Sequence, residues 1–269
     1  MPQKISLIQH SDNIELTTSQ PSIHLDFITA NELLNTRRDL LGRFTKLGLN
    51  SLIGIEEPDK PLTFWLEQFA VLQGRPSNEV SSLLCLKAVL PNPLGIDSDV
   101  IFVDGGNIFD PYLISERSIQ HGLDPEQVLE RIHISRAFTY HQLTTLLCER
   151  LPAALDSYNA KLVIASDMPL LYCDLDIRGD DKQDALAIFL KTVKFLGALA
   201  ERKQVLILAT NLRSRNRRMD ELLLHAAHIS MRFEDAGTFI ELSILKHPWI
   251  PELKVSLPKP YAQTLDAYL

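Results

Sequence analysis

The chain has 269 residues, 45% of them hydrophobic and 23% charged, which is typical of a globular protein large enough to bury a substantial core. A net charge of −7 excludes a surface that is basic throughout, although it is compatible with a local basic patch. No apolar run approaches the ~18 residues of a membrane span, and the N-terminus lacks the apolar stretch of a signal peptide. We therefore expect a soluble intracellular protein, cytoplasmic in a prokaryote and nuclear in a eukaryote.

The three cysteines, Cys85, Cys148 and Cys173, lie among apolar neighbours and have no metal-ligand spacing. Their odd number argues against a disulfide framework, so we expect reduced, buried thiols and no bound metal. His225 and His228 have a spacing that could place both on one helix face. Core packing is nevertheless the stronger interpretation for this pair.

A polar tail over residues 1–20 precedes a helical pattern within 21–45, after which short apolar runs alternate with helical stretches. Such alternation is typical of βαβ units around a mainly parallel sheet. The expected strands are 69–73, 99–105, 132–138, 161–168, 204–211, 228–235 and 238–246. The expected helices are 81–90, 111–120, 125–130, 140–157, 182–202 and 218–226. The turn "EDAGT" predicts that the last two strands pair antiparallel. The expected fold class is therefore α/β, a mainly parallel central sheet flanked by helices, with antiparallel C-terminal strands.

The turn after the first expected strand is similar to a phosphate-binding P-loop. Residues 74–81 read GRPSNEVS, where the P-loop pattern is G-x-x-x-x-G-K-[ST]. Gly74 and the hydroxyl of Ser81 match, whereas Glu79 and Val80 replace the second glycine and the lysine. A helix is expected to begin near Ser81, and helix N-cap is the alternative role of this residue. The turn is either a nucleotide site that has lost its chemistry or an ordinary connection.

Three further strands end in polar residues: "IFVDGG" at Asp104, "LVIASD" at Ser166 and Asp167, and "LILATN" at Thr210 and Asn211. In open α/β sheets, ligands bind beyond the carboxyl ends of the strands. We therefore expect the functional site at this edge of the sheet.

The run "IFVDGGNIFDPYLISERSIQHGLDPEQVLERIHISRAFTYHQLTTLL" closely resembles the segment after the P-loop in archaeal and eukaryotic RecA-like recombinases. "KLVIASDM" resembles the Walker B strand of that family, and "VLILATNL" resembles the strand that carries its polar sensor residue. The resemblance implies a RecA-like P-loop core over residues 46–269. The tail over 1–20 and a linker over 21–45 would precede this core.

The segment "DFITANELLNTRRDLLGRF" resembles the linker before the recombinase core. In that family a phenylalanine, and an alanine three residues later, insert into pockets of the neighbouring subunit. The matching residues are Phe27 and Ala30. The resemblance therefore implies a hetero-oligomer with a RecA-like recombinase or a sister paralogue. Packing of Phe27 on its own domain is the alternative.

The chain departs from the family where a P-loop ATPase has its chemistry. The resemblance places the lysine at Val80, the catalytic glutamate at Gly106 and the Walker B aspartate at Ser166. Asp167 follows one residue later, an offset that turns its side chain to the other face of the strand unless a bulge restores it. We expect a pseudo-ATPase without catalytic residues or a bound cofactor. Weak ATP binding through backbone N–H groups stays open.

Four arginines follow the sensor strand, where the resembled recombinases carry their second DNA-binding loop: Arg213, Arg215, Arg217 and Arg218. Arginine is well suited to phosphate contacts, so the resemblance predicts binding of single-stranded DNA here. A solvated loop paired to nearby acids, or a docking surface for an acidic partner, are the alternatives. The first DNA-binding loop would be "YCDLDIRGDDKQD", which is net acidic.

These observations together predict a non-catalytic recombinase paralogue that acts as an accessory in homologous recombination and DNA repair. One alternative is a divergent DNA-dependent ATPase whose missing groups come from a partner subunit. The other is a structural subunit of a complex unrelated to repair.

Overall fold

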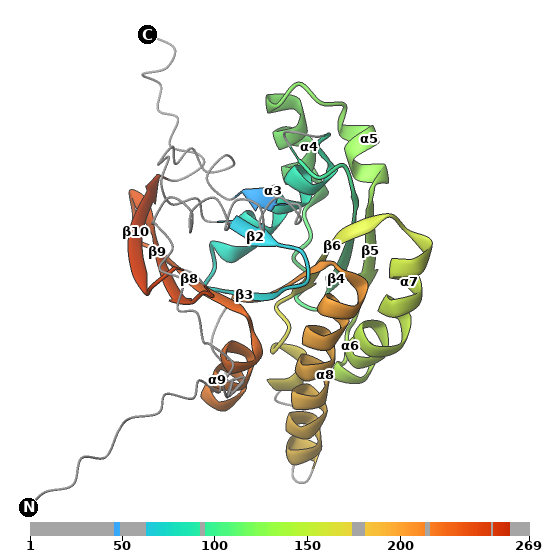
Figure 1. Ribbon diagram of the computed structural model, residues 1–269, viewed down its shortest axis with the longest axis vertical. Helices are drawn as coiled ribbons and strands as arrows, with labels where there is room; N and C mark the ends of the chain where they lie inside the picture. Colours follow the sequence, from blue (N-terminus) through green and yellow to red (C-terminus); the bar gives the residue numbers. More distant parts are fainter. Residues whose placement is uncertain are drawn as a thin grey trace, which may run out of the picture. The chain divides into compact units, whose positions relative to one another are not determined.

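An eight-stranded sheet lies at the centre of the computed structural model, which describes residues 46–48, 63–91, 95–173, 181–212, 216–248 and 250–258 (Figure 1). Its strand order is β10-β9-β8-β3-β7-β6-β4-β5. The strands are β3 (Phe69–Gln73), β4 (Asp99–Asp104), β5 (Ile132–Arg136), β6 (Ala160–Ser166), β7 (Leu206–Asn211), β8 (Ile229–Asp235), β9 (Phe239–Lys246) and β10 (Leu253–Pro258). All neighbours from β8 to β5 pair parallel, and β9 and β10 pair antiparallel. The predicted fold class is confirmed.

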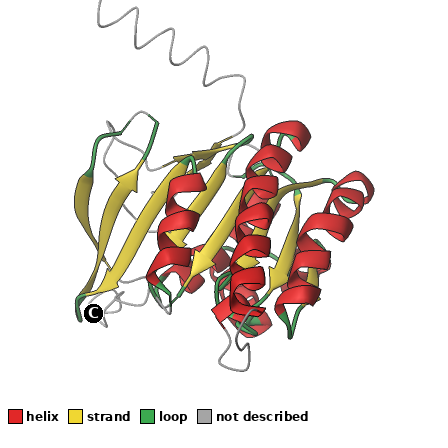
Figure 2. Ribbon diagram, turned by 90° about the horizontal axis from the view of Figure 1, so that it is seen from below, coloured by secondary structure: helices red, strands yellow, loops and turns green. Residues whose placement is uncertain are grey.

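Helices cover both faces of this sheet (Figures 1 and 2). One face carries α3 (Ser77–Val89) and α4 (Pro111–Gln120), with α5 (Pro125–Glu130) beside α4. The other carries α6 (Tyr140–Thr145), the π-helix η1 (Leu146–Arg150), α7 (Leu151–Ser157), α8 (Asp181–Lys203) and α9 (Arg217–Ala226). A short 3-10 turn, η2, spans Leu171–Cys173. None of the described helices is long and apolar enough to cross a membrane.

Most element bounds match those expected from the sequence, and the differences are local. A small sheet of β1 (Lys46–Gly48) and β2 (Thr63–Trp65) was not expected, and β10 at the end of the main sheet was not among the expected strands either. The helix expected over 140–157 contains the π-helical turn η1 in its middle. The helix after β3 begins at Ser77 rather than near Ser81, so this prediction was wrong.

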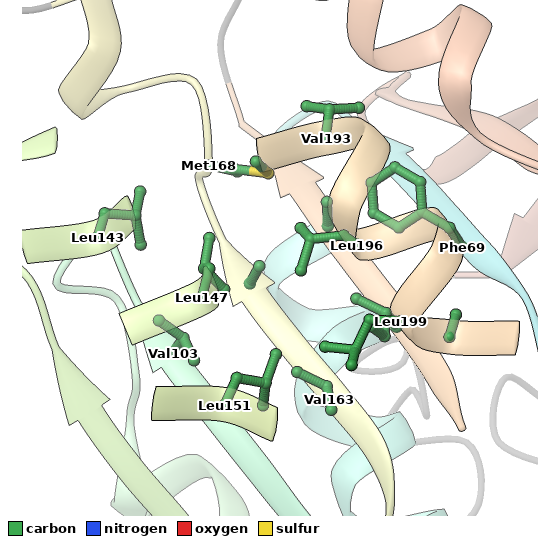
Figure 3. Close-up of a cluster of buried hydrophobic side chains, with 14 of the residues drawn as sticks. Phe69, Val103, Leu143, Leu147, Leu151, Val163, Met168, Val193, Leu196 and Leu199 are labelled. Carbon is green, nitrogen blue, oxygen red and sulfur yellow. The ribbon is translucent and has the colours of Figure 1, made fainter. Parts of the chain in front are cut away.

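The hydrophobic core lies on both sides of the strands. On the side of α8, Phe69, Val103 and Val163 pack with Leu196 and Leu199 (Figure 3). Because side chains alternate along a strand, the intervening residues point to the opposite face, and they are equally buried: Leu72, Phe102 and Ile164. Both faces of the central strands are thus apolar, which leaves the strand ends as the place where polar side chains gather.

Candidate functional site

The turn between β3 and α3 spans residues 74–76 and is fixed by a glycine and a proline. Gly74 has a left-handed φ of 96°, and a Cβ built there would lie 1.9 Å from the carbonyl oxygen of Phe233 on β8. Only glycine fits this position. Pro76, with φ −62°, takes the N-cap position, and its fixed φ leads directly into the helix. This is why α3 begins earlier than the sequence predicted.

The early start of α3 makes residues 77–81 helical, although they align with the phosphate-contacting part of the P-loop pattern. The backbone N–H of Ser77 donates to the Gly74 carbonyl at 3.0 Å, and the N–H of Val80 donates to the Pro76 carbonyl at 3.1 Å. In a P-loop, backbone N–H groups cradle the phosphates. These two N–H groups instead hold the turn and the first turn of the helix.

The side chains at positions 79–81 of this turn and helix also serve the helix. Val80 is buried. Ser81 is fully buried, and its hydroxyl donates to the Asn78 carbonyl at 2.8 Å. Its alternative role as N-cap was therefore wrong, since Pro76 holds that position. Glu79 lies in the first turn of α3, where a negative charge interacts favourably with the helix dipole.

A buried carboxylate lies at the end of β4. Asp104 is inaccessible to solvent, and its two oxygens accept hydrogen bonds from the backbone N–H groups of Ile108 (3.0 Å) and Phe109 (3.2 Å). The hydroxyl of Ser166 donates to it at 2.7 Å, and Arg136 forms an ion pair with it at 3.2 Å. Ser166, at the expected Walker B position, thus directs its side chain at Asp104.

Asp167 lies just beyond β6 in a left-handed conformation, with φ 40°. Its backbone N–H donates to the Thr210 hydroxyl at 2.8 Å, and its carboxylate accepts from the N–H of Leu212 at 3.0 Å. The pairing of β6 with β4 and β7 contains no register shift at this end. The carboxylate therefore caps the end of β7, and no bulge returns it to the strand position before it.

Gly106, the expected position of the catalytic glutamate, packs directly against Asp167. A Cβ added to Gly106 would lie 2.8 Å from the Cβ of Asp167 and 3.3 Å from a methyl group of Ile108. Since real Cβ atoms are not found that close, a glutamate at this position requires Asp167 to move. The absence of a side chain at Gly106 and the position of the Asp167 side chain are therefore sterically coupled.

The arginine cluster is divided between a loop and a helix. Arg213 and Arg215 lie outside the described residues, whereas Arg217 and Arg218 form the first turn of α9 behind the N-cap Asn216. Arg217 is 91% exposed and pairs with Glu221 at 2.8 Å. Cations at a helix N-terminus oppose the helix dipole, so helix stability does not account for this placement.

A cavity of about 490 Å³ opens beside these arginines, between the ends of β3, β7 and β8 and the helix α9. Its polar lining includes Asn211, Asp220 and Arg232. The Asn211 side-chain amide donates to Asp220 at 2.6 Å, and Arg232 donates to the Gln73 side chain at 3.2 and 3.3 Å. The sequence pointed to Asn211 through its strand end, but Asp220 and Arg232 carried no recognisable signal.

The remaining predicted residues fall in different places. Phe27 and Ala30, the tail over 1–20 and the linker over 21–45 lie outside the described residues, as does most of the acidic first DNA-loop segment. Cys85 is buried, and burial raises the pKa of its thiol, whereas Cys148 and Cys173 are half-buried. The core-packing interpretation of the histidine pair was wrong for His225, which is exposed, whereas His228 is half-buried and accepts from the backbone N–H of Phe69 at 3.0 Å. Within the described residues, no cluster of three or more His, Cys, Asp or Glu side chains could hold a metal ion.

The mainly parallel sheet, the glycine turn after β3 and the antiparallel C-terminal strands define an α/β protein of the fold class expected for a RecA-like core. Comparison with known families makes this specific: the Rad51 family model matches residues 74–223, more than half of the chain. The chain therefore belongs to the Rad51 family.

The chain is also similar to meiotic recombination proteins of two plants and of mouse. The chain is 28% identical over 195 residues to a meiotic recombination protein DMC1 homolog of Glycine max, covering 70% of this chain and 54% of the relative. It is 28% identical over 194 residues to DMC1 homolog A of Oryza sativa subsp. japonica (69% and 53%), and 27% identical over 177 residues to the DMC1/LIM15 homolog of Mus musculus (62% and 51%). The chain spans about half the length of these relatives.

Proposed function

We propose that this chain is a non-catalytic member of the Rad51 family that works in homologous recombination by binding a RecA-like recombinase or a sister paralogue. One observation carries the proposal. At each position where the family has ATP chemistry, the group present is engaged inside the fold: Val80 is buried in α3, Gly106 abuts Asp167, and Ser166 binds Asp104.

Electrostatics and geometry support the loss of nucleotide chemistry. Hydrolysis requires a cation on the transferred phosphate, a metal-holding acid and a group that positions water. The side chain at 80 is an apolar valine, and Asp104 already has four hydrogen-bond donors. The helical start of α3 also uses the N–H groups of Ser77 and Val80 internally. Weak ATP binding at this turn is disfavoured for the same reason.

The partner surface that we propose has two parts. The first is the linker pair Phe27 and Ala30, offered to the neighbouring subunit. The second is the edge strand β5, which pairs with β4 on one side only within the part of the chain that the structure describes. Ile134 on this strand and Phe138 just after it are 43% and 69% exposed. An unpaired strand edge next to exposed apolar side chains favours contact with another protein.

Single-stranded DNA is the second ligand that we propose, held through the arginines between β7 and α9. Arg217 and Arg218 lie on an otherwise acidic chain, at a helix end where they gain nothing from the helix dipole. Contacts to phosphates give such a pair a physical role.

Co-elution on a sizing column with the active recombinase of the same organism tests the partner proposal. We expect wild-type protein to co-elute, and Phe27→Ala to elute alone while keeping the wild-type thermal midpoint. Phe239→Ala, an exposed phenylalanine on β9, is the matched control and should co-elute as the wild type does. Failure of the wild type to co-elute with the recombinase or with any sister paralogue would contradict the proposal.

A further inference from the structure

The lining of the cavity beside α9 includes Asn211, whose side chain carries a buried acceptor. Among the described residues, the side-chain oxygen Oδ1 of Asn211 has no hydrogen-bond partner, although Asn211 is only 2% exposed. The amide orientation is fixed because Nδ2 donates to Asp220 at 2.6 Å. Leaving a buried polar atom without a partner is destabilising, so such an atom in a residue that lines a cavity indicates a missing donor.

The structure points to one unstacked nucleobase of single-stranded DNA as the source of this donor. We propose that the cavity takes a base whose exocyclic amine donates to Asn211 Oδ1. The inference rests on the proposed DNA contact of the neighbouring arginines and adds a base-selective site to it. A cavity of about 490 Å³ is large enough for a base, and Leu212, Leu224 and Phe233 supply apolar surface for its ring.

Charged side chains of both signs line the cavity, namely the carboxylates of Asp220, Glu221 and Glu234 and the guanidinium groups of Arg217 and Arg232. Of these carboxylates, Glu221 is paired with Arg217. Arg217 and Arg232 lie in the lining, and Arg218 follows Arg217 in the first turn of α9. A base attached to an anionic backbone supplies the donor while the arginines attract its phosphates.

This geometry predicts a preference among bases. Cytosine presents an amino donor at N4, whereas thymine presents an acceptor at O4 in the equivalent place. An acceptor facing Asn211 Oδ1 is repelled, because neither atom carries a proton. Since phosphate contacts are the same for both bases, we expect oligo(dC) to bind about threefold to tenfold more tightly than oligo(dT) of equal length.

Fluorescence anisotropy with labelled oligo(dC) and oligo(dT) tests this preference on the full chain. Leu224→Phe extends the cavity wall into the space of the base and should abolish the preference by weakening oligo(dC) binding alone. Leu222→Phe, on the same helix but outside the cavity lining, should keep the preference. Unchanged binding of oligo(dT) by the Leu224→Phe variant would show that this variant is folded.

Equal affinity of the wild type for the two oligonucleotides would overturn the base site and leave the phosphate contact of the proposed function standing. A preference for oligo(dC) that survives Leu224→Phe would also overturn it. No binding of either oligonucleotide would overturn both the base site and the proposed DNA contact.

Discussion

The hydroxyl of Ser166 shows how one residue at the end of β6 has become part of the internal structure. It donates at 2.7 Å to Asp104, a carboxylate with no exposed surface. A buried carboxylate is tolerated only when donors surround it, because its desolvation is costly. The serine therefore stabilises the end of β6, at the position where the resemblance to the recombinases predicts a metal-binding acid.

Substitution of this serine should be costly. Ser166→Ala removes one donor from buried Asp104, and we expect the free energy of unfolding to fall by about 1.5–3 kcal/mol, the range for hydrogen bonds to charged groups. Urea denaturation measures the change. Ser115→Ala is the control, since that exposed hydroxyl bonds only to the Pro111 carbonyl of its own helix, and its effect should stay within about 0.5 kcal/mol. Equal effects of the two substitutions would contradict this role of Ser166.

Gly74 offers a second test at a single position. Gly74→Ala places a Cβ 1.9 Å from the Phe233 carbonyl at a left-handed φ, and we expect a loss of about 4 kcal/mol or more, enough to reduce the yield of folded protein. Gly122→Ala separates the two causes, because Gly122 also has a positive φ (70°) but has open space around its Cβ. Gly122→Ala should lower the free energy of unfolding by about 1 kcal/mol. The denaturation midpoints of the two variants and the wild type measure these losses.

At the scale of the element, α9 begins with two cations that oppose its helix dipole, and we propose that they bind DNA. Arg218→Ala removes a cation from the positive end of the helix, so stability should stay the same or rise by about 0.5 kcal/mol. Affinity for single-stranded DNA should fall, and the slope of log K against log salt should decrease by about one unit. Arg202→Ala, at the C-terminal end of α8, is the matched control and should change neither slope nor affinity. A loss of stability without a change of slope would contradict the DNA role.

The edge strand β5 is tied to β4 by a charged cluster that responds to pH. Burial acts to raise the pKa of Asp99, but hydrogen bonds from His133 and Arg131, each 3.0 Å, outweigh it and lower the pKa. A carboxylate with a lowered folded-state pKa stabilises the protein above its unfolded pKa of about 3.9, and this stability is lost as pH falls through the folded pKa.

Asp99→Asn should therefore lower the urea midpoint at neutral pH, and the difference from wild type should shrink as pH falls below about 4. Denaturation across this pH range provides the measurement. A difference that stays constant with pH would show that the charge of Asp99 is not what matters.

Local sequence signals determined most elements. Asp-Pro pairs at 110–111 and 124–125 mark the starts of α4 and α5, where Asp110 and Asp124 accept from backbone N–H groups of the first turn. The helix α3 was wrongly expected to begin near Ser81, because the P-loop spacing indicates a later start than Pro76, the local helix-start signal. The π-helical turn η1 had no signal, since its residues are ordinary helix formers.

For the whole molecule, the sequence predicts the arrangement of strands better than it predicts which residues meet in the site. Alternating strands and helices with apolar strands implied the parallel sheet. The contacts that decide the chemistry join distant segments, as where Asp167 fills the space beside Gly106 and Asp220 meets Asn211. Such pairs follow from three-dimensional packing, which a single sequence read along the chain does not contain.

Binding of MgATP most directly tests the central claim that the nucleotide site has become internal structure. The thermal midpoint of the isolated chain should be the same with and without millimolar MgATP, and no phosphate should be released, alone or with single-stranded DNA. A midpoint raised by about 5 °C or more, as expected for a ligand present at a hundredfold excess over its Kd, would contradict this claim and favour an active ATPase.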